Sequence, residues 1–488
     1  MKNSSILIGW ATTGISPRYP INLGGQMQAR ISKGILDPIT ATALVISSEN
    51  KKEYVMFISC DVCTIRQEVL DRCRAGIKEQ LPEIDVERIV MNATHTHTAP
   101  DLQGSDLPTM PNGVMSTTDY IVFLVEKISK LAYSAWKDLK CGGVSWIYGN
   151  AVVSHNRRAV YFDDLSKRID YKYLPGMTTE RFARMYGNTN DIMFSHIEGY
   201  EDHSLNVLCT WDSKNKLTGL VINLPCPAQV TEGLSQISAD FWNETRNELR
   251  KRFGKSLQIL AQTSAAGDQS PHLLIEKKAT ERMLKLKKTN LRKEIAERIT
   301  RTISEIVPYA KKDIKRKLLF KHNVKNIEIS RRIILKDEFR QAQEDYDVLK
   351  KNLKTMVGTK ENNFLEESFI LSVCARCRRL FEKYQDQKKG NALPIEIHAI
   401  RLGDIVFVTN RFELYLDYGM RIKARSKALQ TFIIQLAGGG KYTGTYLPTA
   451  RAEAGQSYGA CMYSNEVGSK GGQELVEATL EAIEELWE

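Results

Sequence analysis

The sequence contains no apolar run close to the ~20 residues that a membrane-spanning helix requires. Its first ten residues also lack the apolar core and the small-residue cleavage site of a secretory signal. These absences predict a soluble protein without a transmembrane segment, and a cytoplasmic location is expected. A signal peptide removed ahead of residue 1 stays open as an alternative.

The nine cysteines are an odd number and lack the regular spacing of a disulfide framework. Cys60 and Cys63, together with Cys374 and Cys377, could be drawn as a four-thiolate zinc site. However, Cys60 ends an apolar strand pattern, and Cys374 and Cys377 lie as core-facing residues in a helical pattern. The sequence therefore predicts reduced, buried thiols.

No nucleic-acid-binding motif is present, although the formal net charge is +11. Much of this charge lies between Lys277 and Lys321, and a basic run can bind nucleic acid. Glutamates are interspersed there, and the apolar positions follow helical spacing. We therefore interpret the segment as solvated helix faces and expect no nucleic-acid partner.

The composition that is present, with 42% hydrophobic and 26% charged residues over 488 positions, is typical of a globular protein. Residues 41–46 and 54–59 flank a polar turn, which predicts a β-hairpin. Residues 276–390 are expected to form a mostly helical, basic insertion. We predict one α/β domain over residues 1–488, with mixed sheets. Further helices are predicted at 67–79, 120–136, 336–354 and 473–487, further strands at 143–148, 206–211, 220–224 and 257–262, and a second hairpin at 395–408.

His95 and His97 directly follow an apolar run at residues 88–91. If this run is a strand, its two-residue period places both imidazoles on one face. Neutral imidazole is a common zinc ligand, and a second histidine can transfer protons. An ordinary polar loop stays open for this segment alone.

Three later segments also concentrate reactive side chains. Residues 262–271 contain Gly, Asp, Ser and Pro directly after a predicted strand. Such a loop either lets the backbone approach a ligand or is an ordinary turn in which Ser270 caps the next helix. Glu413 follows an apolar strand, and its carboxylate is either a metal ligand or an ordinary surface group. Tyr442 and Tyr446, in a glycine-rich segment, either supply phenols to a site or lie half-buried in a loop.

In this order, the four segments resemble the catalytic domain of the neutral/alkaline non-lysosomal ceramidase family. That family carries a THTHS-type motif, a GDxSP motif, a glutamate before a GxRIKAR-like helix, and a pair of tyrosines near the end. The matching residues here are 94–98, 267–271, Glu413 with 419–425, and Tyr442 with Tyr446, while residues 37–38 and 156–157 also fit. The resemblance extends from Ile8 to the final helix and implies a multilayer, ceramidase-like catalytic domain.

The resemblance implies one zinc ion bound by two histidines, a glutamate and a tyrosine. It assigns His95, Glu413 and Tyr446 as zinc ligands, and it assigns His97 to substrate binding or proton transfer. It also implies that Ser270 takes part in catalysis.

The resemblance further implies that Asp268 of the GDxSP motif is catalytic and that Arg157 lies at the cleft. Residues 157–194 are irregular, charged and rich in tyrosine, which suits the lining of a polar cleft. His155 adjoins this stretch. The predicted substrate-binding residues are therefore Arg157, Tyr442 and His155.

One position departs from the family pattern. Pro227 stands where the second zinc histidine is expected, and proline has no side-chain donor. Cys226 could supply a thiolate instead, or Gln229 an amide oxygen. Otherwise a water completes the coordination or the metal is absent, and three protein ligands with an open position can still be catalytic.

These observations predict a zinc-dependent hydrolase that cleaves an N-acyl bond with a zinc-activated water or with Ser270. Full-length family members carry a C-terminal β-sandwich that this sequence lacks, and no apolar membrane-docking stretch is evident; both points argue against ceramide itself. A carbohydrate or other polar substrate on the same scaffold stays open, as does a metal-free binding protein. The expected partner is a small-molecule substrate, and a homo-oligomer remains an alternative.

Overall fold

The computed structural model describes residues 3–103, 108, 110–356, 364–440 and 445–488. The predicted α/β class is confirmed, because three mixed sheets meet at a shared core and helices cover their outer faces. Tyr442 lies outside the described residues, so its predicted role in substrate binding stays a prediction. Among the described residues, no helix combines the length and apolar character needed to cross a membrane.

The first sheet is built largely from the first 100 residues and is covered by two helices. The helices bury their apolar stripes, such as Val69 and Ile77 in one and Leu124 and Ile128 in the other, against the sheet. Its elements are β15 (Lys317–Leu318), β1 (Ser4–Gly14), β2 (Thr40–Ser48), β3 (Tyr54–Cys60), β4 (Ile89–Ala93), β5 (Lys140–Cys141), α1 (Gln67–Gln80) and α2 (Thr117–Lys137).

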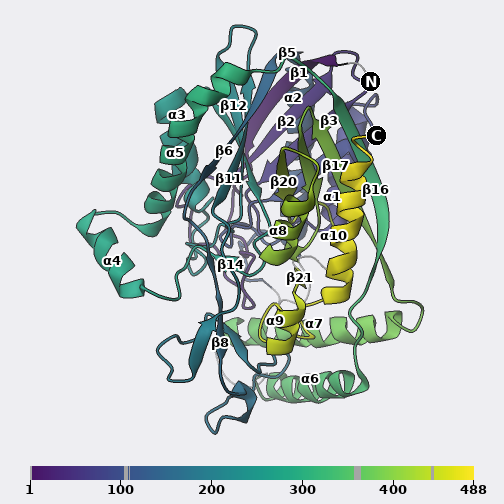
Figure 1. Ribbon diagram of the computed structural model, residues 1–488. Helices are drawn as coiled ribbons and strands as arrows, with labels where there is room; N and C mark the ends of the chain where they lie inside the picture. Colours follow the sequence, from purple (N-terminus) through teal and green to yellow (C-terminus); the bar gives the residue numbers. More distant parts are fainter. Residues whose placement is uncertain (1–2, 104–107, 109, 357–363, 441–444) are drawn as a thin grey trace.

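The second and third sheets have the same plan. In the second, the order is β13 (Gln258–Thr263), β12 (Leu217–Leu224), β11 (Ser204–Trp211) and β6 (Gly143–Asn150), with α3 (Phe241–Phe253) and α5 (Leu291–Ala310) outside. In the third, the order is β16 (Phe320–Ser330), β17 (Ala392–Leu402), β18 (Ile405–Thr409) and β20 (Gln430–Ile434), with α8 (Leu416–Arg425) and α10 (Ser469–Glu484) outside. Figure 1 shows these two helical layers on opposite sides of the molecule.

The predicted hairpins are confirmed as β2–β3 and β17–β18, and the second turns at Gly403 with a φ of 61°. The predicted strands and helices outside residues 157–194 also form, with ends that differ by a few residues. The prediction for 157–194 was wrong in part. Its short strands build a small sheet of β10 (Phe194–Ile197), β8 (Arg158–Tyr161) and β9 (Ala183–Met185), because strands of three or four residues are too short to show a period in the sequence.

Each main sheet contains one pair of parallel neighbours, β3–β4, β12–β13 and β18–β20. Parallel strands end at the same edge of a sheet, and side-chain amides join the three edges. Asn92 donates to the Ala261 carbonyl at 3.1 Å, and Asn223 donates to the Ile433 carbonyl at 2.7 Å. The carboxyl ends of all three parallel pairs therefore meet at one end of the molecule.

Residues 276–390 include α4 (Lys277–Leu286), α5, α6 (Lys336–Met356) and α7 (Phe364–Asp386), but also the long strand β16. Helices α6 and α7 pack together around a separate apolar cluster that contains Cys374 and Cys377, so these two thiols are core residues as predicted. Figure 1 shows both helices crossing the end of the molecule where β14 (Gln269–Ser270) and β21 (Tyr446–Leu447) lie.

Candidate metal centre and substrate cavity

The predicted site segments follow the carboxyl ends of parallel strands, except the segment with His155 and Arg157, which follows the antiparallel strand β6. Ligands commonly bind outside such strand ends, where loops diverge from different sheets. Two of these loops pair again as β19 (Glu413–Leu414) and β21, which places Glu413 opposite Tyr446. The segments carry Cys63 after β3, His95 and His97 after β4, Gln229 after β12, Ser270 after β13, Glu413 after β18 and Tyr446 after β20.

His95 has a strained backbone, with a left-handed φ of 64°, which non-glycine residues rarely adopt. A hydrogen bond from its backbone N–H to the Val62 carbonyl, at 3.0 Å, holds it there. Its ring Nδ1 lies 2.8 Å from the Cys63 carbonyl, which can only accept, so Nδ1 carries a hydrogen. Nε2 is consequently the nitrogen that faces the site, as in histidines that bind metals.

Nε2 of His95 lies 3.3 Å from Nε2 of His97 and 3.4 Å from Oε2 of Glu413. Zinc bonds of about 2.0–2.2 Å in tetrahedral geometry separate neighbouring ligand atoms by about 3.3–3.6 Å. All three side chains are buried. The two distances from Nε2 of His95, to His97 and to Glu413, therefore match the separation of neighbouring ligands on one small divalent ion.

Cys63 joins this group without having been singled out for it. The described residues contain one metal-compatible group of histidine, cysteine and acidic side chains within 4.8 Å of one another, formed by Cys63, His95 and His97. The Cys63 thiol approaches Nδ1 of His95 at 3.8 Å, on the side of the ring that the carbonyl already occupies. We therefore place the metal-facing side at Nε2, with Glu413, rather than at the thiol.

His97 is held as a neutral imidazole. Burial, then the neighbouring His95 and Arg157, lower its pKa well below the usual range. Its Nδ1 has no hydrogen-bond partner among the described residues, and Oε2 of Glu232 lies 3.6 Å away. The pKa of His95 is raised instead: burial lowers it, but Cys63 and Glu413 more than offset burial. The site thus favours a positive charge beside Glu413.

The structure separates the two candidates for the missing ligand. Nε2 of Gln229 donates to Nε2 of His97 at 2.9 Å, while its Oε1, the atom predicted to bind zinc, lies 3.4 Å from a guanidinium nitrogen of Arg157. Gln229 therefore bridges two site residues through both amide atoms. Cys226 is not brought to His95: its thiol donates to the Val153 carbonyl at 3.2 Å, and burial raises its pKa well above the usual range.

Tyr446 lies beside Glu413, opposite it in the β19–β21 pair. Burial, followed by the charge of Glu413, raises the pKa of the Tyr446 phenol well above its usual range, so the phenol keeps its proton in this arrangement. Its oxygen accepts from Arg157 at 3.3 Å, and Arg157 also donates to the Gly267 carbonyl at 2.8 Å. The imidazole, carboxylate and phenol that the sequence predicted together are thus brought together.

Ser270 and Asp268 lie behind this group. The Ser270 hydroxyl is fully buried and accepts from the Tyr186 phenol at 2.9 Å and from the His272 N–H at 3.1 Å. Asp268 accepts from Asn156 at 2.8 Å and from a backbone N–H, and burial raises its pKa to about 6. Ser270 and Asp268 therefore hold loops around the site in position through these hydrogen bonds, and their catalytic roles stay predictions.

His155 pairs with Glu201, its Nδ1 lying 3.1 Å from the carboxylate. It lies in β7 (His155–Asn156), opposite Ser270 of β14. Neither His155 nor any residue of 157–194 lines the cavity beside His95, so the prediction that this stretch lines the cleft is not met at this cavity. Substrate binding by His155 stays a prediction.

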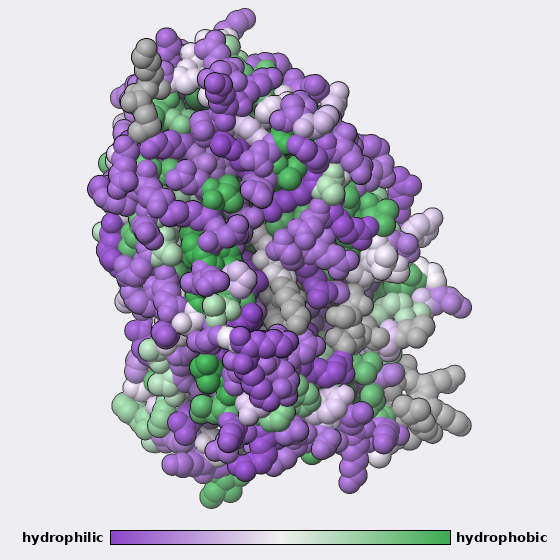
Figure 2. All heavy atoms as spheres, turned by 90° about the vertical axis from the view of Figure 1, so that its right-hand side faces the viewer, coloured by the Kyte–Doolittle hydropathy of each residue, from purple (hydrophilic) through white to green (hydrophobic). Residues whose placement is uncertain are grey.

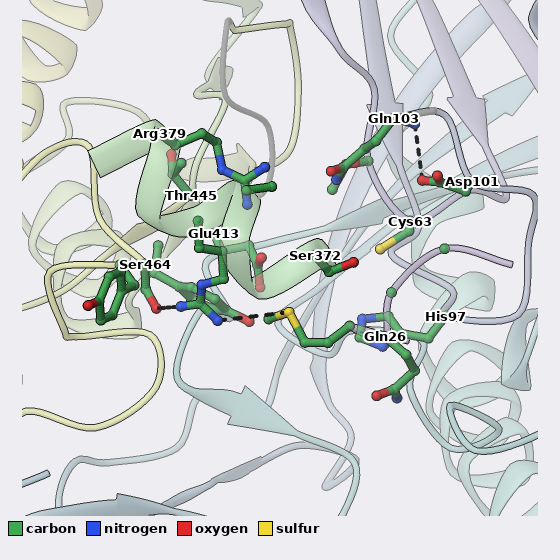
Figure 3. Close-up of a pocket in the computed structure, with 18 of the residues that line it drawn as sticks. Gln26, Cys63, His97, Asp101, Gln103, Ser372, Arg379, Glu413, Thr445 and Ser464 are labelled. Atoms are coloured by element: carbon green, nitrogen blue, oxygen red, sulfur yellow. Dashed lines mark hydrogen bonds between the residues drawn. The ribbon is translucent and has the colours of Figure 1, made fainter. Parts of the chain in front are cut away.

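A cavity of about 210 Å³ opens beside His95, His97 and Glu413. Figure 3 shows Glu413 and Arg379 on one side, with Cys63, Asp101 and Gln103 facing them. Gly25 allows the loop at residues 22–28 to approach, because a Cβ there would lie 2.4 Å from the His97 ring. Helix α7 contributes Ser372, Ala375, Arg376, Arg379 and Lys383 to the lining.

No protein-family model matches the chain, and no curated protein matches it by sequence. The neutral ceramidase from Pseudomonas aeruginosa aligns with a TM-score of 0.66 at 16% identity, over 99% of this chain and 75% of that chain. The chain has a neutral-ceramidase-like fold. A ceramidase complexed with C2 aligns with a TM-score of 0.64 at 16% identity, over 99% of this chain and 76% of that chain. Identity this low shows the fold alone, so activity must be argued from the site.

Proposed function

We propose that this protein is a metal-dependent hydrolase that cleaves an N-acyl bond in a small polar substrate. The observation that carries the proposal is that His97 and Glu413 both lie within 3.4 Å of Nε2 of His95, next to a cavity and within a neutral-ceramidase-like fold. Two imidazoles and a carboxylate are the ligand types typical of catalytic zinc. Zinc is accordingly the metal proposed.

His97 supplies the second imidazole in this proposal. Pro227 cannot bind a metal, and Cys226 is engaged elsewhere. His97, in contrast, already lies 3.3 Å from His95, and the Glu232 carboxylate faces its other nitrogen. A carboxylate behind a ligating histidine orients the ring and raises its basicity. Binding requires His97 to exchange its hydrogen bond from Gln229 for the metal.

A bound divalent ion would polarise an amide carbonyl and lower the pKa of a bound water. The protein's own residues would position the substrate and stabilise the charge that develops on it. The Tyr446 phenol, held by Arg157, is a donor placed beside Glu413, where it can stabilise negative charge that develops on the carbonyl oxygen. Arg157 keeps this phenol oriented through its second bond to the Gly267 carbonyl.

Attack by water is favoured over attack by Ser270. Ser270 does not line the cavity, and no imidazole nitrogen or carboxylate is among its hydrogen-bond partners within the described residues. A serine nucleophile needs such a base to activate it. Ser270 therefore acts in this proposal by fixing the loop that carries Gly267.

The size and polarity of the cavity favour a small substrate over a long-chain lipid. Its volume of about 210 Å³ is below the ~300–1,000 Å³ of common ligand pockets. The face of the molecule drawn in Figure 2 is mostly hydrophilic, with only small, separated apolar groups. This face therefore shows no continuous apolar patch of the kind that docking onto lipid needs, and the preference for a small substrate rests on the volume of the cavity.

The test is hydrolysis of a panel of short- and long-chain N-acyl compounds and glycosides, before and after removal of metal with a chelator. We expect short N-acyl compounds to be cleaved, chelation to abolish turnover, and added zinc to restore it. His95→Ala should remain inactive after zinc is added. Turnover that survives both chelation and His95→Ala would refute a metal-dependent reaction, and binding without turnover would indicate a binding protein.

A further inference from the structure

Helix α7 gives the cavity a positively charged wall. Arg376, Arg379 and Lys383 are spaced by three and four residues, so they lie on one face of the helix, and all three line the cavity. Arg66 is a fourth cation in the lining, whereas its carboxylates are Glu413, which faces His95, and Asp101. The lining therefore contains four cationic side chains and two carboxylates, and three of the cations come from α7.

Arg376 is the most informative of these residues, because it is buried without a carboxylate. Its side chain belongs to a residue only 4% exposed, yet no carboxylate of the described residues lies within ion-pair distance. One guanidinium nitrogen donates to the Ser464 hydroxyl at 2.9 Å, and the other faces the thioethers of Met27 and Met177 at 3.9 and 4.0 Å. Thioethers are weak acceptors, and a buried charge without a counter-ion is costly.

Lys383, further along α7, also lies close to other positive charges. Lys383 donates to the Asn465 carbonyl at 2.8 Å, and its pKa falls to about 8. Burial is the largest cause, and Arg379, Arg332 and Arg376 lower it further, against the opposing charge of Glu466. An anion in the cavity would relieve this repulsion as well as pair with Arg376.

We propose that the substrate carries an anionic group, a carboxylate, sulfate or phosphate, which binds Arg376 and Arg379 while its amide lies at His95 and Glu413. This inference rests on the proposed function and names the substrate class for the same site. Guanidinium groups suit the role, because their planar donors match the oxygens of all three anions. In this assignment α7 determines specificity and the loops after the parallel strands carry out the reaction.

The experiment compares four substrates with one acyl group: N-butanoylglycine, N-butanoylaminoethyl sulfate, N-butanoylaminoethyl phosphate and the neutral N-butanoylglycinamide. We expect kcat/KM for at least one anionic substrate to exceed that for the neutral amide by about tenfold or more. Arg376→Gln should remove this preference mainly through KM, and Arg376→Lys should restore part of it. The relative rates among the three anions identify the anionic group.

Arg378→Gln is the matched control, because it removes the same charge from the same helix at a position that does not line the cavity. It should keep the preference. If Arg376→Gln does not fold, Arg379→Gln at the half-buried neighbouring position tests the same point. Equal kcat/KM for neutral and anionic substrates would overturn the inference and leave the hydrolase intact.

If no substrate is cleaved, calorimetry with sulfate, phosphate and N-butanoylglycine decides the inference separately from the reaction. Binding to the as-purified protein that is lost in Arg376→Gln but kept in Arg378→Gln would support the anion site while the hydrolase proposal fails. No binding of any of the three probes would overturn the anion site.

Discussion

The molecule contains two buried histidine pairs, each with a glutamate beside it, and they differ in what surrounds them. In one, Nε2 of His322 lies 3.0 Å from Nδ1 of His398, whose other nitrogen lies 3.0 Å from Glu396. The last ring nitrogen and the carboxylate also have partners: Nδ1 of His322 donates to the Tyr54 carbonyl at 2.9 Å, and Arg74 pairs with Glu396 at 2.7 Å. This pair does not line the cavity.

The pair formed by His95 and His97 is incomplete in comparison. Nδ1 of His97 has no hydrogen-bond partner among the described residues. Among the described residues Glu413 forms an ion pair with His95, and no arginine lies within ion-pair distance of it as Arg74 does of Glu396. A histidine pair with a glutamate is therefore structural where its hydrogen bonds are complete, and a candidate for metal binding where they are open beside a cavity.

The largest expected difference between the two groups is in metal affinity. Glu413→Gln removes the charge that would balance a divalent ion, so zinc affinity and turnover should fall by at least about 100-fold. Glu396→Gln makes the same chemical change next to His398 and should leave both unchanged. Zinc titration by calorimetry measures the affinity, and equal effects of the two variants would contradict the comparison.

Sequence patterns predicted the elements that have a clear period, such as α1 and the β17–β18 hairpin, because one buried face imposes that period. They also predicted that His95, Glu413 and Tyr446 converge, but only through resemblance to a family. They missed Arg376 and Arg379. The helical spacing of α7 shows that a face exists, whereas only the packed structure shows that this face meets loops 22–28 and 445–446 across a cavity.

The choice between Cys226 and Gln229 could not be made from the sequence either. The two residues are three positions apart in a loop without regular structure, so no period fixes their directions. In the structure the Cys226 thiol meets the Val153 carbonyl and Gln229 meets His97. Cys63 was discounted together with Cys60, which ends an apolar strand pattern, although the turn after β3 brings Cys63 beside His95.

A smaller effect is expected when the ring of His97 is displaced without changing any ligand. A Cβ at Gly25, where φ is 94°, would lie 2.4 Å from the ring, so Gly25→Ala should weaken zinc binding by about tenfold. Gly34→Ala is the matched control, because Gly34 also has a positive φ, of 130°, but open space around its Cβ. Zinc affinity that falls equally in both variants would point to backbone strain instead.

The pair formed by His322 and His398 should contribute to the stability of the fold and not to metal binding. His322→Ala leaves the Tyr54 carbonyl and a ring nitrogen of His398 without partners, which should lower the free energy of unfolding by about 1–3 kcal/mol. Zinc content should not change. Denaturant unfolding followed by circular dichroism measures the difference, and a stable variant that has lost zinc would reverse the roles of the two pairs.

The smallest expected effect concerns pH. Burial, then the neighbouring His398, lowers the pKa of His322 to about 3, while an unfolded histidine has a pKa of about 6.5. The unfolded chain therefore binds the extra proton between these values, and stability falls as pH decreases from about 6.5 toward 3. The slope should reach at most about 1.4 kcal/mol per pH unit and should be reduced in His322→Gln. Unfolding curves at several pH values test this, and identical slopes would contradict it.

The most direct measurement is the zinc content of the purified protein, determined by mass spectrometry for the wild type, His95→Ala and His398→Ala. We expect stoichiometric zinc in the wild type and in His398→Ala, and none in His95→Ala, after each protein is loaded and passed through gel filtration. Zinc retained equally by all three proteins, or lost from His398→Ala alone, would contradict the assignment of the metal to His95.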